Sequence, residues 1–192
     1  MKLLQLCHAA RPWYLQNGYI RSYHSWDHAQ EVVASLPDGA SPELTLAAYW
    51  HDAVYVPGAG SDANERCSAA ALARSAINED AETQEIVEKA VQLILYTDIE
   101  THFNPNQITG DLGALLDADL RSLSLPYDTF IERQKNIILE AGGTYEVNHV
   151  DSAQFLQKFL EVREFIYHTQ FGREIWEKDA RRNIARYQTE EA

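Results

Sequence analysis

The segment Leu44-Thr-Leu-Ala-Ala-Tyr-Trp-His-Asp52 is the most informative stretch of this chain. Its apolar residues indicate a buried helix, which runs directly into an adjacent His-Asp pair. Neighbouring His and Asp side chains can bind one divalent metal ion where a helix ends. The pair alone is weak evidence, but His28 lies upstream in a second amphipathic stretch and Asp119 lies far downstream. The ordered series His, His-Asp, Asp is therefore the first candidate for a functional site.

The chain of 192 residues is long enough for one well-packed domain, which we expect to span residues 1–192. The hydrophobic fraction of 45 % and the charged fraction of 23 % are ordinary for a soluble globular protein. No apolar stretch approaches the ~20 residues of a membrane span. The N-terminal segment starts like a signal peptide but is broken by Gln5, His8 and Arg11. We therefore expect a cytoplasmic protein that does not enter a membrane.

The formal net charge of −13 argues against binding to polymeric nucleic acid, because such binding depends on a basic surface. Cys7 and Cys67 are too few for a disulfide framework and do not have the spacing of a two-cysteine metal site. We expect both to be reduced thiols. A phosphorylated substrate would have to be held by local cations and a metal. Homodimerisation is left open by the sequence.

Helical periodicity runs through every long segment, and Gly and Pro cluster between the segments, so we expect an all-α, single-domain helical bundle. Ser25 can cap a helix that runs to about Ser35, and Ser41-Pro42 opens the helix that ends near Asp52. Ser61 is the expected cap of the next helix. Further helices are expected at about 61–78, 81–96, 111–120, 126–140, 151–167 and 173–187, with a long loop over residues 98–110.

Two imidazoles and two carboxylates suit one divalent ion, for which Mn, Fe, Co, Ni, Zn and Mg are candidates, with positions left for water and a phosphoryl oxygen. Such an ion supplies the usual route to hydrolysis near neutral pH. Asp52 follows the most apolar run of the chain, where an unpaired carboxylate would be costly, so a bound cation is the simplest explanation for it. We expect the ligands to be His28, His51, Asp52 and Asp119, with Asp117 in reserve.

Five segments carry a resemblance to a known family. They are residues 21–28 (Arg-Ser-Tyr-His-Ser-Trp-Asp-His), 47–55 (Ala-Ala-Tyr-Trp-His-Asp-Ala-Val-Tyr), 62–69 (Asp-Ala-Asn-Glu-Arg-Cys-Ser-Ala), 115–120 (Leu-Leu-Asp-Ala-Asp-Leu) and 166–169 (Ile-Tyr-His-Thr). In this order they resemble the predicted metal-dependent phosphohydrolases of the HD-domain superfamily. The resemblance implies an all-α HD fold and places the metal ligands on the four residues named above. It implies no particular substrate.

Candidates for acid–base chemistry and substrate binding surround these ligands. Glu65, early in the third helix, is the first choice for the acid or base, although helix-start electrostatics explain it equally well. Related HD hydrolases carry an acidic residue sooner after the His-Asp pair, where this chain has Tyr55. Arg21 could clamp a phosphate, His24 could donate to one, and His102 could contact substrate or a second metal.

The leading hypothesis is a metal-dependent phosphohydrolase that uses metal-activated water on a small phosphorylated molecule, plausibly a nucleotide. A di-iron HD-fold oxygenase is the first alternative, but it needs two extra His between the His-Asp pair and the last Asp, where the chain offers only His102. A non-catalytic nucleotide-binding or regulatory HD module is the second alternative, and no sequence feature excludes it.

Overall fold

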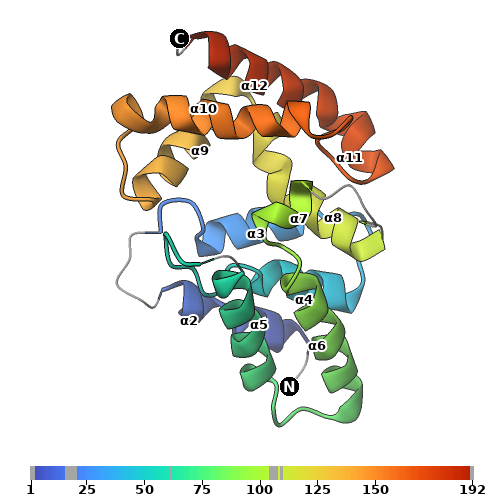
Figure 1. The fold of residues 1–192 in the computed structure, drawn as a ribbon. Helices are drawn as coiled ribbons and strands as arrows, with labels where there is room; N and C mark the ends of the chain where they lie inside the picture. Colours follow the sequence, from blue (N-terminus) through green and yellow to red (C-terminus); the bar gives the residue numbers. More distant parts are fainter. Residues whose placement is uncertain (1–2, 16–20, 61, 104–107, 109, 191–192) are drawn as a thin grey trace.

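The computed structural model describes residues 3–15, 21–60, 62–103, 108 and 110–190, and every regular element in that part of the chain is a helix (Figure 1). The predicted all-α class is therefore confirmed for the described residues. In chain order the elements are α1 (Leu3–His8), α2 (Arg11–Tyr14), α3 (Trp26–Ala34), α4 (Pro42–Trp50), α5 (Ala63–Ser75), α6 (Ala81–Ile94), α7 (Ile99–Phe103), α8 (Gly110–Asp119), the 3₁₀ helix η1 (Leu120–Ser124), α9 (Tyr127–Glu140), α10 (Tyr145–Glu161), α11 (Gln170–Ile175) and α12 (Glu177–Glu190).

Side-chain caps set the starts of α3 and α4, as predicted. The Ser25 hydroxyl accepts a hydrogen bond from the backbone N–H of His28, and the Ser41 hydroxyl accepts one from the N–H of Leu44. Pro42 follows as the first residue of α4, where its missing N–H costs nothing. These caps place His28 in the first turn of α3. The predicted cap Ser61 lies outside the described residues, and α5 itself begins at Ala63.

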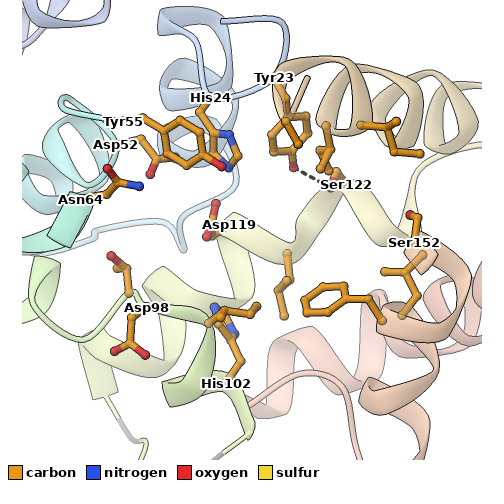
Figure 2. Close-up of a pocket in the computed structure, with 18 of the residues that line it drawn as sticks. Tyr23, His24, Asp52, Tyr55, Asn64, Asp98, His102, Asp119, Ser122 and Ser152 are labelled. Carbon is orange, nitrogen blue, oxygen red and sulfur yellow. Dashed lines mark hydrogen bonds between the residues drawn. The ribbon is translucent and has the colours of Figure 1, made fainter. Parts of the chain in front are cut away.

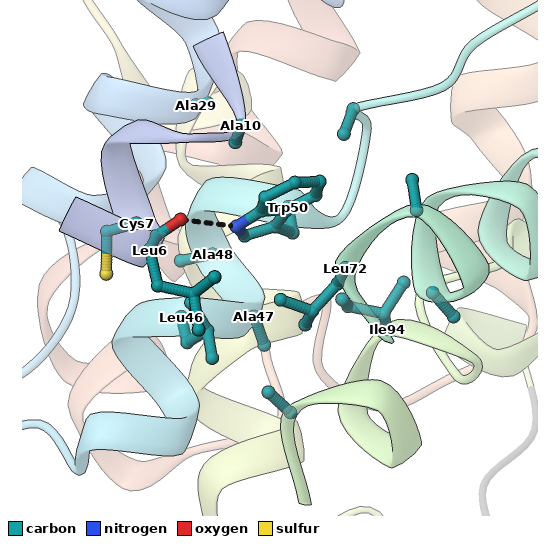
Figure 3. Close-up of a cluster of buried hydrophobic side chains, with 14 of the residues drawn as sticks. Leu6, Cys7, Ala10, Ala29, Leu46, Ala47, Ala48, Trp50, Leu72 and Ile94 are labelled. Atoms are coloured by element: carbon teal, nitrogen blue, oxygen red, sulfur yellow. Dashed lines mark hydrogen bonds between the residues drawn. The ribbon is translucent and has the colours of Figure 1, made fainter. Parts of the chain in front are cut away.

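Helix α4 is buried on nearly every side, so it forms the centre of the larger hydrophobic cluster (Figure 3). A helix that is apolar all round must be covered all round, and α1, α3, α6 and α8 pack against it. Trp50, the last residue of α4, is fully buried, and its indole N–H donates to the carbonyl of Leu6 in α1. This contact ties the last residue of α4, next to the His-Asp pair, to α1.

A second hydrophobic cluster is built from η1 and the C-terminal helices α9 to α12. Its largest fully buried side chains include Phe130, Phe159, Tyr167 and Tyr187. Figure 1 shows these helices gathered at one end of the molecule and α4, α5 and α6 at the other, with α3, α7 and α8 between them. The candidate ligands therefore lie between the two clusters. No helix in the described ranges has the length and hydrophobicity needed to cross a membrane.

Three predicted segments near the C-terminal half were wrong in their bounds. The expected loop over residues 98–110 contains the short helix α7, and its residues 104–107 and 109 lie outside the described residues. The helix expected at 151–167 begins earlier and ends earlier, as Tyr145–Glu161, because Gly142 adopts a left-handed turn and the next helix starts almost at once. The helix expected at 173–187 is two helices, α11 and α12, separated at Trp176.

The segment between α10 and α11 is held by a long-range contact. The Glu177 carboxylate, at the start of α12, accepts hydrogen bonds from the backbone N–H groups of Ile166 and Tyr167. This buried carboxylate supports a non-helical backbone that carries two apolar side chains into the second cluster. Periodicity alone cannot reveal such an interaction, because the partner lies in a later element.

Candidate metal centre

Three helix ends bring the four predicted ligands together. His28 lies in the first turn of α3, His51 and Asp52 follow the last residue of α4, and Asp119 is the last residue of α8. Helices α3, α4 and α8 pack against one another in all three pairs. The prediction that the His-Asp pair stands where a helix ends is confirmed, and this position lets both side chains face the same point.

The four side chains lie close enough together to hold one metal ion. One potential ligand atom from each of His28, His51, Asp52 and Asp119 lies within 4.8 Å of all the others. Asp119 Oδ1 is 2.9 Å from His28 Nε2 and 3.5 Å from His51 Nε2, and Asp52 Oδ2 is 2.9 Å from His51 Nε2 and 3.6 Å from His28 Nε2. Two carboxylate oxygens and two imidazole nitrogens thus surround one small volume.

His51 carries the clearest sign that the cluster suits a cation. Its Nδ1 lies 2.9 Å from the carbonyl oxygen of Ala48, which can only accept, so Nδ1 bears the proton. Its Nε2 is buried and makes no well-aligned hydrogen bond, although Asp52 lies beside it. A second-sphere carbonyl that fixes the tautomer and leaves Nε2 free is the usual arrangement of a metal-bound histidine. The residues present therefore fit a divalent ion.

Electrostatics at the cluster favour positive charge. Burial acts to raise the pKa of Asp52, but His51 and His24 lower it to about 2 overall. Burial opposes ionisation of Asp119 as well, yet the hydrogen bond with His28 and the neighbouring His51 hold its pKa well below the usual range. The same carboxylates raise the pKa of His51 well above normal despite its burial. These carboxylates therefore favour a positive charge at this point of the structure.

Arg21 has a different role from the phosphate clamp that we predicted. Its guanidinium donates to the backbone carbonyls of His24, Asp52 and Ala53 and lies over the ring of Tyr14. It does not line the cavity beside the ligands. Arg21 therefore holds the chain that follows α4 in place, and its charge is directed at backbone oxygens.

His24 lines the cavity, as predicted, and is held there by two residues that the sequence did not single out. Its Nδ1 lies 2.8 Å from Oε1 of Glu140, and its ring stacks on Tyr55 with 3.8 Å between the ring centroids. Glu140 Oε2 also accepts from the backbone N–H groups of Tyr23 and His24. Glu140 ends α9, where an acidic residue looks like ordinary solvent-exposed sequence, so only its burial in the fold reveals the role.

Of two further candidates, His102 lines the cavity and Asp117 has a structural role. His102, in α7, lines the cavity and is buried, and its Nδ1 has no hydrogen-bond partner among the described residues. Asp117, the reserve ligand, instead accepts hydrogen bonds from the backbone N–H groups of His168 and Thr169 and from the Thr169 hydroxyl. It ties α8 to the start of α11 and is not part of the metal cluster.

A cavity of about 740 Å³ opens beside the cluster (Figure 2). Its volume is that of a small-molecule site. His51, Asp52 and Asp119 line it, and Glu65, the predicted acid or base, lines it from the first turn of α5. Burial and the nearby Asp52 raise the pKa of Glu65, which favours its holding a proton. Figure 2 shows His24 and Tyr55 on one side of Asp119, with Asp98 and His102 on the other.

Comparisons with protein-family models, curated proteins and solved structures found no match to this chain.

Proposed function

We propose that the protein is a metal-dependent phosphohydrolase of the HD-domain superfamily that acts on a small phosphorylated molecule. The observation that carries the proposal is the position of the cluster: three of its four residues line a cavity large enough for a small substrate. His28, His51, Asp52 and Asp119 would hold one divalent ion. Such an ion, when bound, supplies a Lewis acid for water and for a phosphoryl oxygen.

The reaction would be simple hydrolysis of a phosphate ester. The oxygen of water forms a new bond to phosphorus, the ester P–O bond breaks, and one proton reaches the departing alcohol oxygen. Glu65 would give or take that proton. It lines the cavity, and its raised pKa favours the protonated form compared with a glutamate in water. His24 is placed to donate to a phosphate oxygen through Nε2, since Glu140 engages Nδ1.

The presence of one ligand cluster in the described ranges favours a hydrolase with one metal ion over the di-iron oxygenase. The four residues form the only cluster of at least three His, Cys, Asp or Glu ligand groups in the described ranges. His102 lies in the cavity wall, but it belongs to no second cluster of that kind. A di-iron oxygenase would need about six protein ligands, so the ligand count favours one metal and hydrolytic chemistry.

A metal-supplemented hydrolysis panel tests this proposal. Purified protein loaded in turn with Mn²⁺, Fe²⁺, Co²⁺, Ni²⁺, Zn²⁺ or Mg²⁺ is given phosphomonoesters, nucleotides and diphosphate esters, and released phosphate is measured. We expect turnover with at least one ion, and losses of more than about 100-fold in His51→Ala and Asp52→Ala, because even outer partners of metal ligands are worth ~10–100-fold. Asp38→Ala, an exposed carboxylate in a loop, is the control that should retain activity. Metal-loaded protein that hydrolyses no substrate class would refute the proposal and favour a binding module.

A further inference from the structure

The charges that line the main cavity are unusual for a phosphate site. Among the described residues of its wall there is no Lys and no Arg. The wall instead contains seven carboxylates, which are Asp52, Asp62, Glu65, Asp98, Glu100, Asp119 and Asp151. Only two of these are candidate metal ligands, so their charge is the part that a divalent ion would neutralise. A ligand with several phosphate groups would bring its remaining charges near the other carboxylates, with no Lys or Arg among the described wall residues to compensate.

The opposite end of the cavity carries several apolar side chains, next to Gln134, Asn148, Asp151 and Ser152. The apolar side chains come from η1, α9 and α10 and are those of Leu123, Ile137, Ile138, Phe155, Leu156 and Phe159, which we call the apolar bay. Phe155 is 38 % exposed and packs edge to face on Phe159, so it is the bay residue with the most surface left for a ligand, whereas Leu123, Ile138, Leu156 and Phe159 are buried. Figure 2 shows Ser152, from the same helix, on the far side of the cavity from Asp52.

The metal cluster and the apolar bay lie in the same cavity, and this limits which ligand can occupy both. The bay and the metal cluster line one cavity, so a molecule anchored at the cluster through one phosphate would lay its other end against the bay. Burial of apolar surface then supplies the affinity that the missing cationic side chains do not. Gln134 is the buried polar side chain in this part of the wall, and its Oε1 accepts from the Ser152 hydroxyl.

We propose that the substrate is a monophosphate ester of an alcohol whose carbon skeleton is mainly apolar and occupies the apolar bay. This inference rests on the proposed phosphohydrolase function. The ester P–O bond is hydrolysed by water, which yields the free apolar alcohol and inorganic phosphate. We expect nucleoside diphosphates and triphosphates to be poor substrates, because their additional phosphates would add negative charge to a cavity that Glu65, Asp98 and Glu100 also line.

A chain-length series tests the inference. The metal-loaded protein is assayed with n-alkyl phosphates from ethyl to octyl, and with AMP, ADP and ATP. We expect kcat/KM to rise about three- to fourfold per added methylene until the bay is filled, which is the effect of burying one CH₂ group. ATP should be a poorer substrate than AMP. Turnover with no dependence on chain length, or a preference for ATP, would overturn the inference while leaving the hydrolase function intact.

Variants and a binding measurement separate the two proposals. Phe155→Ala should lower kcat/KM for octyl phosphate at least tenfold, whereas Val147→Ala, at an exposed position of the same helix, should not change it. Calorimetric titration of the Mn²⁺-loaded wild type with n-alkyl phosphonates gives a readout that needs no turnover. A Kd that falls with chain length supports the bay even if no ester is hydrolysed, and a Kd independent of chain length rejects it.

Discussion

Glu140 holds Tyr23 and His24, two residues of the cavity wall, in place. Its two carboxylate oxygens together contact the backbone N–H groups of Tyr23 and His24 and the imidazole of His24. The Glu140 side chain is buried. Burial acts to raise its pKa, but His24 and these N–H groups lower it overall. One carboxylate from α9 therefore fixes the turn that leads into α3 and His28.

Replacement of Glu140 should show this role directly. Glu140→Ala leaves two backbone donors and a histidine without their acceptor, so we expect a loss of about 2–4 kcal/mol in the free energy of unfolding. Glu132→Ala, an exposed carboxylate on the same helix, should change it by less than about 0.5 kcal/mol. Urea unfolding followed by circular dichroism measures both, and equal stabilities of the two variants would contradict the assigned role.

His102 should make stability depend on pH. Burial, with a smaller contribution from Arg163, lowers its pKa to about 4, although Asp119 and Asp98 oppose the shift. Between pH 6.5 and 4 the unfolded chain therefore binds a proton that the folded chain does not, so stability falls as the pH falls, by up to about 1.4 kcal/mol per pH unit.

The variant His102→Gln isolates this contribution. Stability measured by urea unfolding at pH 6.5 and at pH 4.5 should drop less in the variant than in the wild type. His168 also has a pKa lowered by burial, to about 3, so part of the acid sensitivity should remain. An identical loss in wild type and variant would show that His102 does not titrate in this range.

The role of a residue could be predicted from the sequence where the residue type itself points to that role. His28, His51, Asp52 and Asp119 were predicted because two imidazoles and two carboxylates suit one divalent ion, and the fold brings them together. Arg21 and Glu140 could not be assigned in this way. Their roles depend on partners distant in the chain, such as the carbonyl of Asp52 and the N–H of Tyr23.

At the scale of elements, serine caps made the starts of α3 and α4 predictable, but a cap alone was not sufficient, because Thr169 caps α11 and its start was still missed. Ser25 and Ser41 cap α3 and α4 at the expected places. Helix α10 begins after Thr144, whose side chain makes no capping hydrogen bond, and its bounds were missed. The break between α11 and α12 was also missed. It falls at Trp176, a residue of the C-terminal cluster, and helical periodicity does not mark it.

Gly172 tests the junction between α8 and α11. A Cβ atom at this position would lie 2.5 Å from Asp117 Oδ2 and 2.8 Å from Tyr167 Cβ, so the buried acceptor of the Thr169 turn would have to move. We expect Gly172→Ala to lower the free energy of unfolding by about 1–3 kcal/mol. Gly60→Ala, which meets nothing within 4 Å, is the matched control. A calorimetric melting temperature equal to that of the wild type would contradict the packing described here.

At the scale of the whole molecule, the candidate centre lies between two hydrophobic clusters. α3, α4 and α8 supply the ligands, while η1, α9 and α10 supply the apolar end of the same cavity. The all-helical class followed from periodicity, but the cavity could not be predicted, because its wall combines residues from most of the chain. The absence of Lys and Arg among its described lining residues also became visible only in three dimensions.

Metal content is the most direct test of the central claim. The protein is purified without chelators, loaded with each candidate divalent ion, desalted and analysed by elemental mass spectrometry beside His51→Ala, Asp52→Ala and the control Asp38→Ala. We predict about one ion per chain in the wild type and the control, and little or none in the two ligand variants, whose folding is checked by circular dichroism. Wild-type protein that retains no divalent ion, or ligand variants that retain as much as the wild type, would contradict the assignment of His28, His51, Asp52 and Asp119 as a metal centre.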